Sequence, residues 1–306
     1  MSLHLGFLTH VHGEDVPAGP LYRDLLELFV AAEELGYQSG WVAQHHLQPE
    51  HGRLPSPLVF LAAAAERTRR IHLGTAVTVL PLEHPLRLAE DALVLDALSG
   101  GRLELGLGSG APEHDAFAVF GRDPARRHED YDRNLAELVT ALEGHDLAHR
   151  LWDSSLRAEV LTDGARSGRG VLLGVGPADV VQRGLADLHR EVPVPRIAAV
   201  RGVFPGPSRA AVAAELAPDV LRYLPMHVQA GWADGSTDLP GLLRLMNVQY
   251  GRPEDVVASL RADPVLAGPG THLIAAVQAE SSTVGRALRR LEVLATTIAP
   301  ELGWTP

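Results

Sequence analysis

Segments typical of β-strands and of α-helices alternate along the chain, and this alternation restricts the fold more than any other feature. An apolar run at residues 3–8 precedes a segment at 21–35, in which Leu25 and Leu28 recur at helical spacing. Strands separated by helices pair in parallel, which predicts a wound or closed parallel sheet. The chain of 306 residues has a usual length for eight βα units, and it contains no linker or internal repeat. We therefore expect a single TIM-type (β/α)8 barrel domain over residues 1–306.

The remaining elements follow from the same patterns. Strands are expected at 40–43, 71–80, 102–107, 171–175, 196–203 and 271–277, and helices at 57–67, 85–98, 124–142, 177–188, 208–223, 253–261 and 282–298. This gives seven strands, and residues 144–170 are read as a long irregular excursion. Only residues 189–195 separate one expected helix from the next strand, which is too few for a complete βα unit. We expect the sixth βα unit to be missing or vestigial there.

The composition removes several classes of function. All 27 basic residues are arginine, so Schiff-base chemistry, pyridoxal-phosphate attachment and the P-loop lysine are excluded. The absence of cysteine excludes disulfides, thiolate metal sites and cysteine nucleophiles. A net charge of −11 opposes binding to nucleic acid. The longest apolar run, residues 58–65, is too short to span a bilayer, and no leader pattern opens the chain. We expect a cytoplasmic protein.

The segment Gln44-His45-His46 follows the second predicted strand. In a barrel the C-terminal ends of the strands carry the active site. One of the two imidazoles would act there as a general base or as a hydrogen-bond donor to a bound ligand. A capping or core histidine is the alternative interpretation, and the strand-end position gives the two equal weight.

Another pair, His10 and His12, follows the first predicted strand as an H-x-H motif. This placement is similar to that in metal-dependent amidohydrolases, but those enzymes commonly need a carboxylated lysine, which is absent here. The later strand ends near Val175 and Val203 offer no histidine either. We therefore expect His10 and His12 to be loop or pocket-wall residues, and we expect no metal.

Glycines cluster at residues 106–110, after the fourth predicted strand. Small residues at this place let backbone N–H groups approach a phosphate or a flat ring system, so Gly108 and Ser109 are candidate cofactor contacts. A dinucleotide site would need an acidic residue about 20 positions further on. Arg126 and Arg127 lie there instead, which suits a phosphate better than a ribose.

Taken together, these segments resemble the flavin-dependent, luciferase-like monooxygenases. The similarity rests on their order and spacing up to about Tyr131, and it resumes near the C-terminus. It comprises Gln44-His45-His46, Gly74-Thr75-Ala76-Val77, Leu80-Pro81, His84-Pro85, Arg87, Ala89-Glu90-Asp91, Leu95-Asp96, Ser99, Gly101-Arg102 and Gly106, then Gly251-Arg252-Pro253-Glu254, Ala295 and Pro300.

The resemblance implies a role for each matched position. His45 would be the catalytic histidine beside the flavin, with Gln44 in place of the acid that usually precedes this pair. Ala76 and Val77 would form a non-proline cis peptide that presses on the flavin ring, and Glu90 would lie beneath the isoalloxazine.

The phosphate end of the cofactor site departs from the family pattern. Ser109 stands where luciferase has an arginine, and Gly176 where many relatives have a serine. Arg127 or its neighbour Arg126 is the candidate that remains for binding the phosphate.

The resemblance also implies an activity. We expect a monooxygenase that takes reduced FMN from a separate flavin reductase and uses O2 to oxidise an aldehyde or another small organic molecule. The family pairs through helices of the first half, so a homodimer is expected through helices 57–67 and 85–98. Two alternatives stay open: a deazaflavin-dependent oxidoreductase that transfers hydride, and a non-catalytic flavin-binding protein, which the weakened phosphate site and the incomplete barrel would suit.

Overall fold

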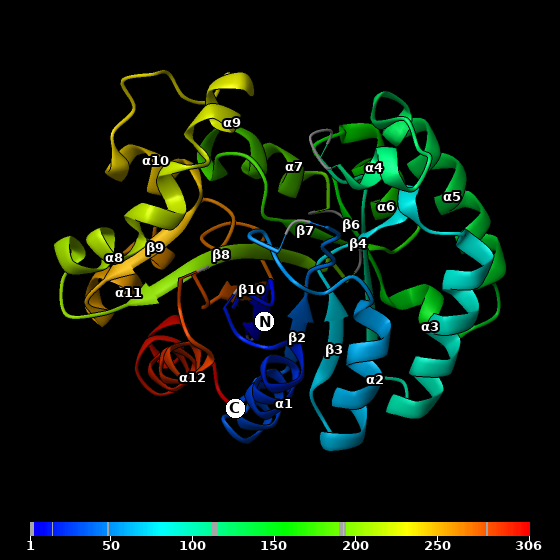
Figure 1. The fold of residues 1–306 in the computed structure, drawn as a ribbon, viewed down its shortest axis with the longest axis horizontal. Coiled ribbons are helices and arrows are strands. Elements are labelled where there is room, and N and C mark those ends of the chain that lie inside the picture. Colours follow the sequence, from blue (N-terminus) through cyan, green and yellow to red (C-terminus); the bar gives the residue numbers. More distant parts are fainter. Residues whose placement is uncertain are drawn as a thin grey trace.

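Eight parallel strands close into a barrel with helices on its outside, as the sequence predicted (Figure 1). The computed structural model describes residues 3–13, 15–47, 49–111, 115–189, 192, 194–279 and 281–306. The ring runs in the order β1-β2-β3-β5-β6-β7-β8-β10, and β10 pairs with both β8 and β1. Its strands are β1 (His4–Thr9), β2 (Ser39–Val42), β3 (His72–Thr75), β5 (Leu103–Gly108), β6 (Leu151–Ser154), β7 (Gly170–Leu173), β8 (Ile197–Pro205) and β10 (His272–Ala276).

Two further strands extend the sheet beyond the ring. The short β4 (Thr78–Val79) follows β3 after a break at residues 76–77 and pairs with the end of β5. The strand β9 (Val248–Gly251) pairs with residues 202–205, which form the part of β8 that overhangs the barrel.

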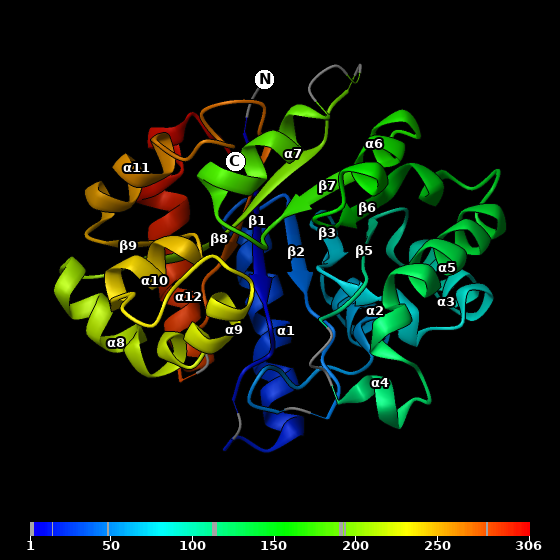
Figure 2. The same cartoon turned by 90° about the horizontal axis from the view of Figure 1, so that it is seen from above.

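The helices lie outside the ring, and most of them follow a strand of the barrel (Figure 2). They are α1 (Ala18–Glu34), α2 (Pro57–Arg67), α3 (Pro85–Ser99), α4 (Ala116–Val119), α5 (Arg127–Ala141), α6 (Ala158–Arg166), α7 (Arg183–Asp187), α8 (Arg209–Leu221), α9 (Leu224–Gln229), α10 (Leu239–Leu245), α11 (Pro253–Arg261) and α12 (Val284–Val293). Short 3₁₀ or π turns occupy Leu80–Leu82, Pro124–Arg126, Asp146–Arg150, Ala178–Gln182, Leu294–Ile298 and Pro300–Leu302. None of the helices in the described part of the chain is long and apolar enough to cross a membrane.

The expectation of a missing sixth βα unit is wrong. The ring has eight strands, and the strand that the sequence did not reveal is β6, which lies with α6 inside the segment read as an excursion. Its third residue, Asp153, is fully buried and accepts hydrogen bonds from the Tyr131 hydroxyl at 3.0 Å and from Arg169 Nε at 2.9 Å. A four-residue strand with a buried, ion-paired aspartate in it has no apolar run from which the strand could be predicted. Of residues 189–195, where the gap was expected, Arg190, Glu191 and Pro193 lie outside the described residues.

Two tryptophans fill the lower part of the barrel interior. Trp41 of β2 and Trp152 of β6 meet edge to face, with their ring centroids 5.5 Å apart. Each ring lies against a glycine, Gly74 or Gly170, at which a Cβ atom would overlap the indole. The residues above them are small: Ala76, Val77 and Ala276 pack on this cluster and are only partly buried. The barrel is therefore solid below and open toward the C-terminal ends of its strands.

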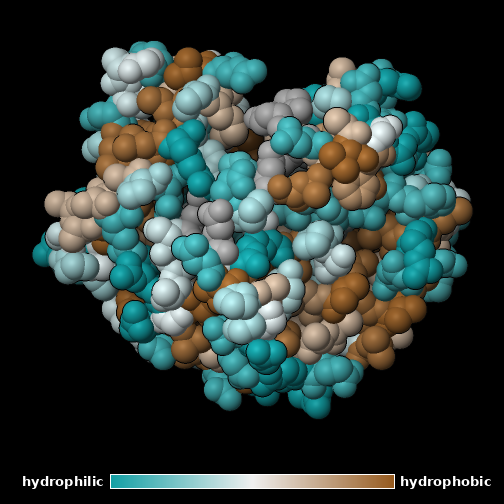
Figure 3. All heavy atoms as spheres, viewed as in Figure 1, coloured by the Kyte–Doolittle hydropathy of each residue, from teal (hydrophilic) through white to brown (hydrophobic). Residues whose placement is uncertain are grey.

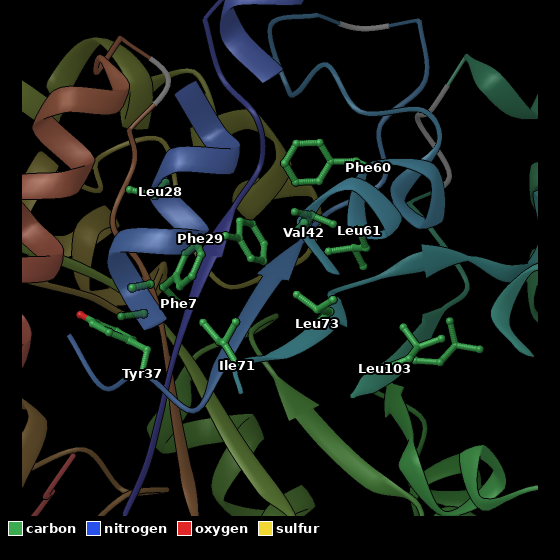
Figure 4. Packing of buried hydrophobic residues seen from close by; sticks show 14 of the residues in the cluster. Phe7, Leu28, Phe29, Tyr37, Val42, Phe60, Leu61, Ile71, Leu73 and Leu103 are labelled. Atoms are coloured by element: carbon green, nitrogen blue, oxygen red, sulfur yellow. The ribbon is translucent and has the colours of Figure 1, made fainter. Parts of the chain in front are cut away.

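Between the barrel and its first helices lies a larger apolar core, and aromatic rings link its layers (Figure 4). Phe29 of α1 packs on Phe7 of β1, with centroids 4.9 Å apart, and on Phe60 of α2 at 5.8 Å. Leucine, valine and alanine make up most of this core, as a chain with 5% aromatic residues requires. These contacts fix the first helices, and with them the loops above β1 and β2.

A histidine pair lies at the opposite, N-terminal mouth of the barrel. His4 of β1 stacks on His272 of β10 at 4.5 Å, and the Trp152 ring lies 5.2 Å from His272. Burial, together with the positive charge of Arg196 and the neighbouring His4 and His72, lowers the pKa of His272 from 6.5 to about 3. The folded state therefore keeps His272 neutral in mildly acidic solution.

We predict that His272 makes the fold sensitive to acid. The unfolded chain binds a proton at His272 below pH 6.5, and the folded chain does not. The contribution of His272 to the free energy of unfolding is therefore fully present above that pH and is lost as the pH decreases. Between pH 7.5 and 5.5 this histidine alone should remove about 1.4 kcal/mol from the free energy of unfolding. Urea titrations of the wild type and of His272→Gln check this, since the variant should lose about that much less on acidification. An equal loss in the variant would contradict the prediction, and His145→Gln on the surface is the matched control.

Candidate active site

A pocket of about 480 Å³ opens above the C-terminal ends of β1, β2, β7, β8 and β10. Figure 3 shows a hollow at the upper edge of the molecule, between the part that contains α9 and the part that contains α4. The pocket has a polar wall and an apolar wall. The polar wall includes His10, His12, His45, His51, Tyr223 and Gln278, and the apolar wall includes Phe204, Leu216, Val220, Met226, Trp232, Leu245, Met246 and Val248. Its volume is typical of sites for small organic ligands.

The histidines of the polar wall contact one another. His10 Nδ1 lies 3.0 Å from His45 Nε2, which is a hydrogen-bond distance. The rings of His10 and His12 stack with centroids 5.5 Å apart. Across the pocket, His51 Nδ1 lies 3.3 Å from the Tyr223 hydroxyl. The H-x-H motif thus lines the pocket, as the sequence predicted.

Burial keeps two of these imidazoles neutral. It is the main cause that lowers the pKa of His10 to about 4, and His51 adds to the effect. Burial likewise lowers the pKa of His12 to about 2, with contributions from His10, Arg222 and His51. At neutral pH each of these rings therefore has one nitrogen that donates and one that accepts a hydrogen bond.

The adjacent residues His45 and His46 point to different surroundings. His45 lines the pocket, whereas the His46 ring packs edge to face on Phe120 with centroids 4.9 Å apart. Burial lowers the pKa of His46, and its Nε2 atom has no hydrogen-bond partner among the described residues. Of the two adjacent histidines, His45 is therefore the one that lines the pocket.

The peptide bond between Ala76 and Val77 is cis, which confirms the prediction for this position. Hydrogen bonds to the end of β2 hold both sides of the bond in place: Ala76 N donates to Val42 O at 2.8 Å, and Gln44 N donates to Val77 O at 3.1 Å. The resulting bulge faces the barrel interior in the same layer as Ala276, which lines the pocket.

The side-chain amide of Gln44, which the family resemblance made a candidate cofactor contact, bonds to protein. Its Oε1 atom accepts from Val79 N at 2.7 Å, and its Nε2 atom donates to Glu83 Oε1 at 2.7 Å and to Pro55 O at 3.2 Å. The side chain is 5% exposed. Its amide therefore bonds to protein on both sides, and Gln44 positions the cis bulge from behind.

The glycine cluster serves the same bulge. A Cβ atom on Gly108 would lie 2.6 Å from Val77 Cγ2, so a larger residue would displace Val77. Ser109 follows at the end of β5 and is half-buried, and Ala111 lines the pocket. Gln44 and Gly108 thus both lie against the bulge at Val77, and of the four residues expected beside the pocket, His45 is in its lining.

Gly176 belongs to the pocket wall, whereas Arg127 does not. Gly176 lines the pocket, and its carbonyl accepts from Gln182 Nε2 at 2.7 Å and from Asn247 Nδ2 at 2.9 Å. Arg127 begins α5 outside the pocket lining; its Nη1 donates to Pro124 O at 3.2 Å, and its buried Nε has no partner among the described residues.

The expectation for Glu90 is wrong. Its side chain is 73% exposed on the outer face of α3, where its carboxylate lies 3.6 Å from Arg87. The neighbouring positions Ala89 and Ala92 occupy the buried face of this helix, so Glu90 turns away from the barrel.

Several pocket residues could not be identified from the sequence. His51, Tyr223, Trp232 and Gln278 lie on loops or irregular connections, where no periodic pattern marks their direction. Gln278 is the most constrained of them: its Oε1 accepts from the Thr9 hydroxyl at 2.8 Å, and its Nε2 donates to His12 O at 3.1 Å. It joins the loops above β10 and β1.

The residues at the barrel mouth suit a flat ring system better than a phosphate. Ala76, Val77 and Gly108 are small; Gly108 lies against Val77, and Ala76 and Val77 pack in the same cluster as the pocket residue Ala276. Among the described residues that line the pocket there is no arginine. Ser109, Gly176 and Arg127 stay predictions for the phosphate end.

Comparison with known proteins agrees with this geometry. Residues 1–150 match the family model described as luciferase-like monooxygenase. The chain is 34% identical to an uncharacterized protein, y4wF, of Sinorhizobium fredii over 60% of this chain and 59% of that protein. It is 44% identical to 4-hydroxyprotoasukamycin monooxygenase of Streptomyces nodosus over 47% of this chain and 36% of that protein. An F420-dependent glucose-6-phosphate dehydrogenase of Amycolatopsis mediterranei is 36% identical over 43% and 38%. The chain thus spans less than two thirds of these relatives.

Solved structures share the fold over nearly the whole chain. The monooxygenase RslO1 from Streptomyces bottropensis superposes with a TM-score of 0.80 at 20% identity, over 97% of this chain and 99% of that one. The oxygenating constituent of 3,6-diketocamphane monooxygenase from Pseudomonas putida, solved with FMN, gives 0.76 at 18% identity, over 98% and 99%. The part of the chain that matches the luciferase-like monooxygenase family, residues 1–150, includes the first four strands of the ring, the cis peptide and His45.

Proposed function

We propose that this chain is one barrel domain that acts in the cytoplasm as a flavin-dependent monooxygenase. It would take reduced FMN from a separate reductase and use O2 to oxidise an aldehyde or a similar small molecule. The observation that carries the proposal is the open upper end of the barrel, where His45 and Ala276 line one pocket and the small residues Ala76 and Val77 pack in the same cluster as Ala276. Relatives named as monooxygenases, and a structural neighbour in complex with FMN, support it.

The residues of the chain would divide the work of such a site. The flavin ring would contact Ala76, Val77 and Gly108. Its phosphate would lie toward Ser109, Gly176 and Arg127. Bound reduced flavin would supply the reaction with oxygen. His45 would hold or transfer a proton at its imidazole, since this group exchanges protons near neutrality. The apolar wall excludes water and suits a substrate with a hydrocarbon body.

A deazaflavin-dependent oxidoreductase is the second candidate, because some relatives are F420-dependent. One of the two arguments for a non-catalytic flavin-binding protein, the incomplete barrel, no longer holds, because the barrel is complete. Fluorescence titration of the purified protein with FMN and with F420, followed by incubation with FMN, NADH and a flavin reductase and a mass-spectrometric survey of aldehydes, tests the three functions together. Binding of F420 alone would overturn the FMN proposal, and FMN binding without any oxygenated product would favour the non-catalytic protein.

We predict that Ser109→Arg strengthens the binding of FMN. An arginine at the half-buried end of β5 would add a charged hydrogen bond to the phosphate, which is worth about 1.5–3 kcal/mol and hence at least tenfold in Kd. Isothermal titration with FMN measures the change, and titration with riboflavin, which lacks the phosphate, serves as the ligand control. Equal strengthening for both ligands would show that residue 109 does not face the phosphate.

We predict that His45→Ala retains FMN binding and loses most of the oxygenation. General acid–base assistance is typically worth about 10²–10⁴-fold, so the loss of turnover should be large. His46→Ala is the matched control, because its ring packs on Phe120 outside the pocket lining. A larger loss of turnover per folded molecule in His46→Ala than in His45→Ala would reverse the assignment.

We predict a homodimer that forms through α2 and α3. Val59 of α2 and Leu86, Val94 and Leu98 of α3 are each more than half exposed, and Figure 3 shows hydrophobic residues gathered over α3. Val94→Glu should shift the protein toward the monomer, as measured by light scattering at micromolar concentration. Val194→Glu is the matched control, because Val194 is exposed away from these helices. A wild-type monomer at this concentration would refute the proposal.

A further inference from the structure

We propose that His10 is a positioning residue for His45, and that its Nδ1 atom fixes the ring orientation and the tautomer with which His45 serves the pocket. This inference rests on the proposed function, because it concerns the histidine to which that function gives the proton. It adds a residue of the first βα loop to the site.

The contact between the two rings is specific. His10 Nδ1 and His45 Nε2 are 3.0 Å apart, with ring centroids at 5.3 Å and planes tilted by 48°. At this distance one of the two nitrogens carries a proton and donates a hydrogen bond, and the other nitrogen accepts that bond. The protonation of His45 Nε2 is therefore coupled to that of His10 Nδ1.

The other side of the His45 ring is confined by backbone. A Cβ atom on Gly52 would overlap the His45 ring, so this glycine lets the chain pass directly against the imidazole. His45 N also donates to Leu54 O at 3.0 Å. The segment 52–54 thus restricts the ring from one side, and His10 is the side chain that orients it from another.

His10 is itself held in place. Its ring lies on that of His12, and His12 O accepts a hydrogen bond from the buried Gln278. The groups that face this cluster are His51, Asp219, Tyr223 and, beside His12, Arg222. Since burial lowers the pKa of His10 and of His12, His10 meets His45 as a neutral partner at neutral pH.

A shared proton has a consequence for the charge of the pair. Two imidazolium ions at 3.0 Å in a desolvated pocket would repel each other strongly, so the pair carries at most one positive charge near neutrality. Removal of His10 would take away the hydrogen bond that favours one tautomer of His45.

Two substitutions of His10 separate positioning from mere packing. The Nδ2 or Oδ1 atom of His10→Asn occupies nearly the place of Nδ1, so it can keep the hydrogen bond to His45 but cannot take up a proton. His10→Leu keeps a similar volume and removes the bond. We expect His10→Asn to retain kcat within about threefold, and His10→Leu to lose about 10- to 100-fold in kcat with KM unchanged, which is part of the range for acid–base assistance. His46→Leu is the control for loss of an imidazole outside the pocket.

A second readout does not depend on activity. Nitrogen-15 NMR of the imidazoles in the purified protein should show His45 as a single tautomer in the wild type and in His10→Asn, and as an averaged mixture in His10→Leu. A single tautomer in all three proteins would overturn the proposal. Equal loss of kcat in both variants, with His45 still fixed in His10→Asn, would replace positioning by proton transfer through His10. If no protein oxygenates any substrate, the proposed function fails, and the tautomer measurement still decides the role of His10.

Discussion

The site depends on the hydrogen bonds by which the end of β2 holds the break between β3 and β4. Gln44 binds Val77 through its backbone and Val79 through its side chain, and Val42 binds Ala76, so two residues at and just after the end of β2 hold the cis peptide. Because Gln44 and His45 are adjacent in the chain, the residue that fixes the bulge also sets the direction of the pocket histidine. Glu83 and Pro55 complete the bonding of the Gln44 amide, which ties the loop after β2 to the segment that leads into α3.

The solid lower barrel has a complementary effect on the pocket. Trp41 and Trp152 occupy the interior next to glycines that give them room, so the lumen below the bulge is filled by side chains. The side chains of the layer above, Ala76, Val77 and Ala276, are small, so they leave space for a ligand over them. The two indole rings thus fill the barrel below the pocket without lining it, while the polar character of the pocket comes from loops above β1, β2 and β10.

Much of the fold could be predicted from the sequence, since seven of the ring strands and the helices that flank them carry clear apolar periodicity. The eighth strand could not, because the burial of Asp153 depends on Arg169 and Tyr131, which pattern alone does not connect to it. The cis peptide and the pocket position of His45 followed from similarity to a family. The outward direction of Glu90 and the inward bonding of Gln44 follow from local packing, which a motif does not encode. The contact between His10 and His45 joins two loops that are 35 residues apart, and only the closed ring brings them together.

The overhang of β8 divides the pocket in a way that bears on how such a protein can diverge. The histidines of the polar wall belong to residues 10–51 and thus to the region of family similarity, whereas most of the apolar wall comes from one continuous stretch, residues 204–248. That stretch leaves the ring at the end of β8 and returns beside it as β9, so it is anchored by pairing outside the barrel. Substitutions and length changes within it can alter the shape of the ligand that the pocket accepts while the closed ring and its histidines stay as they are.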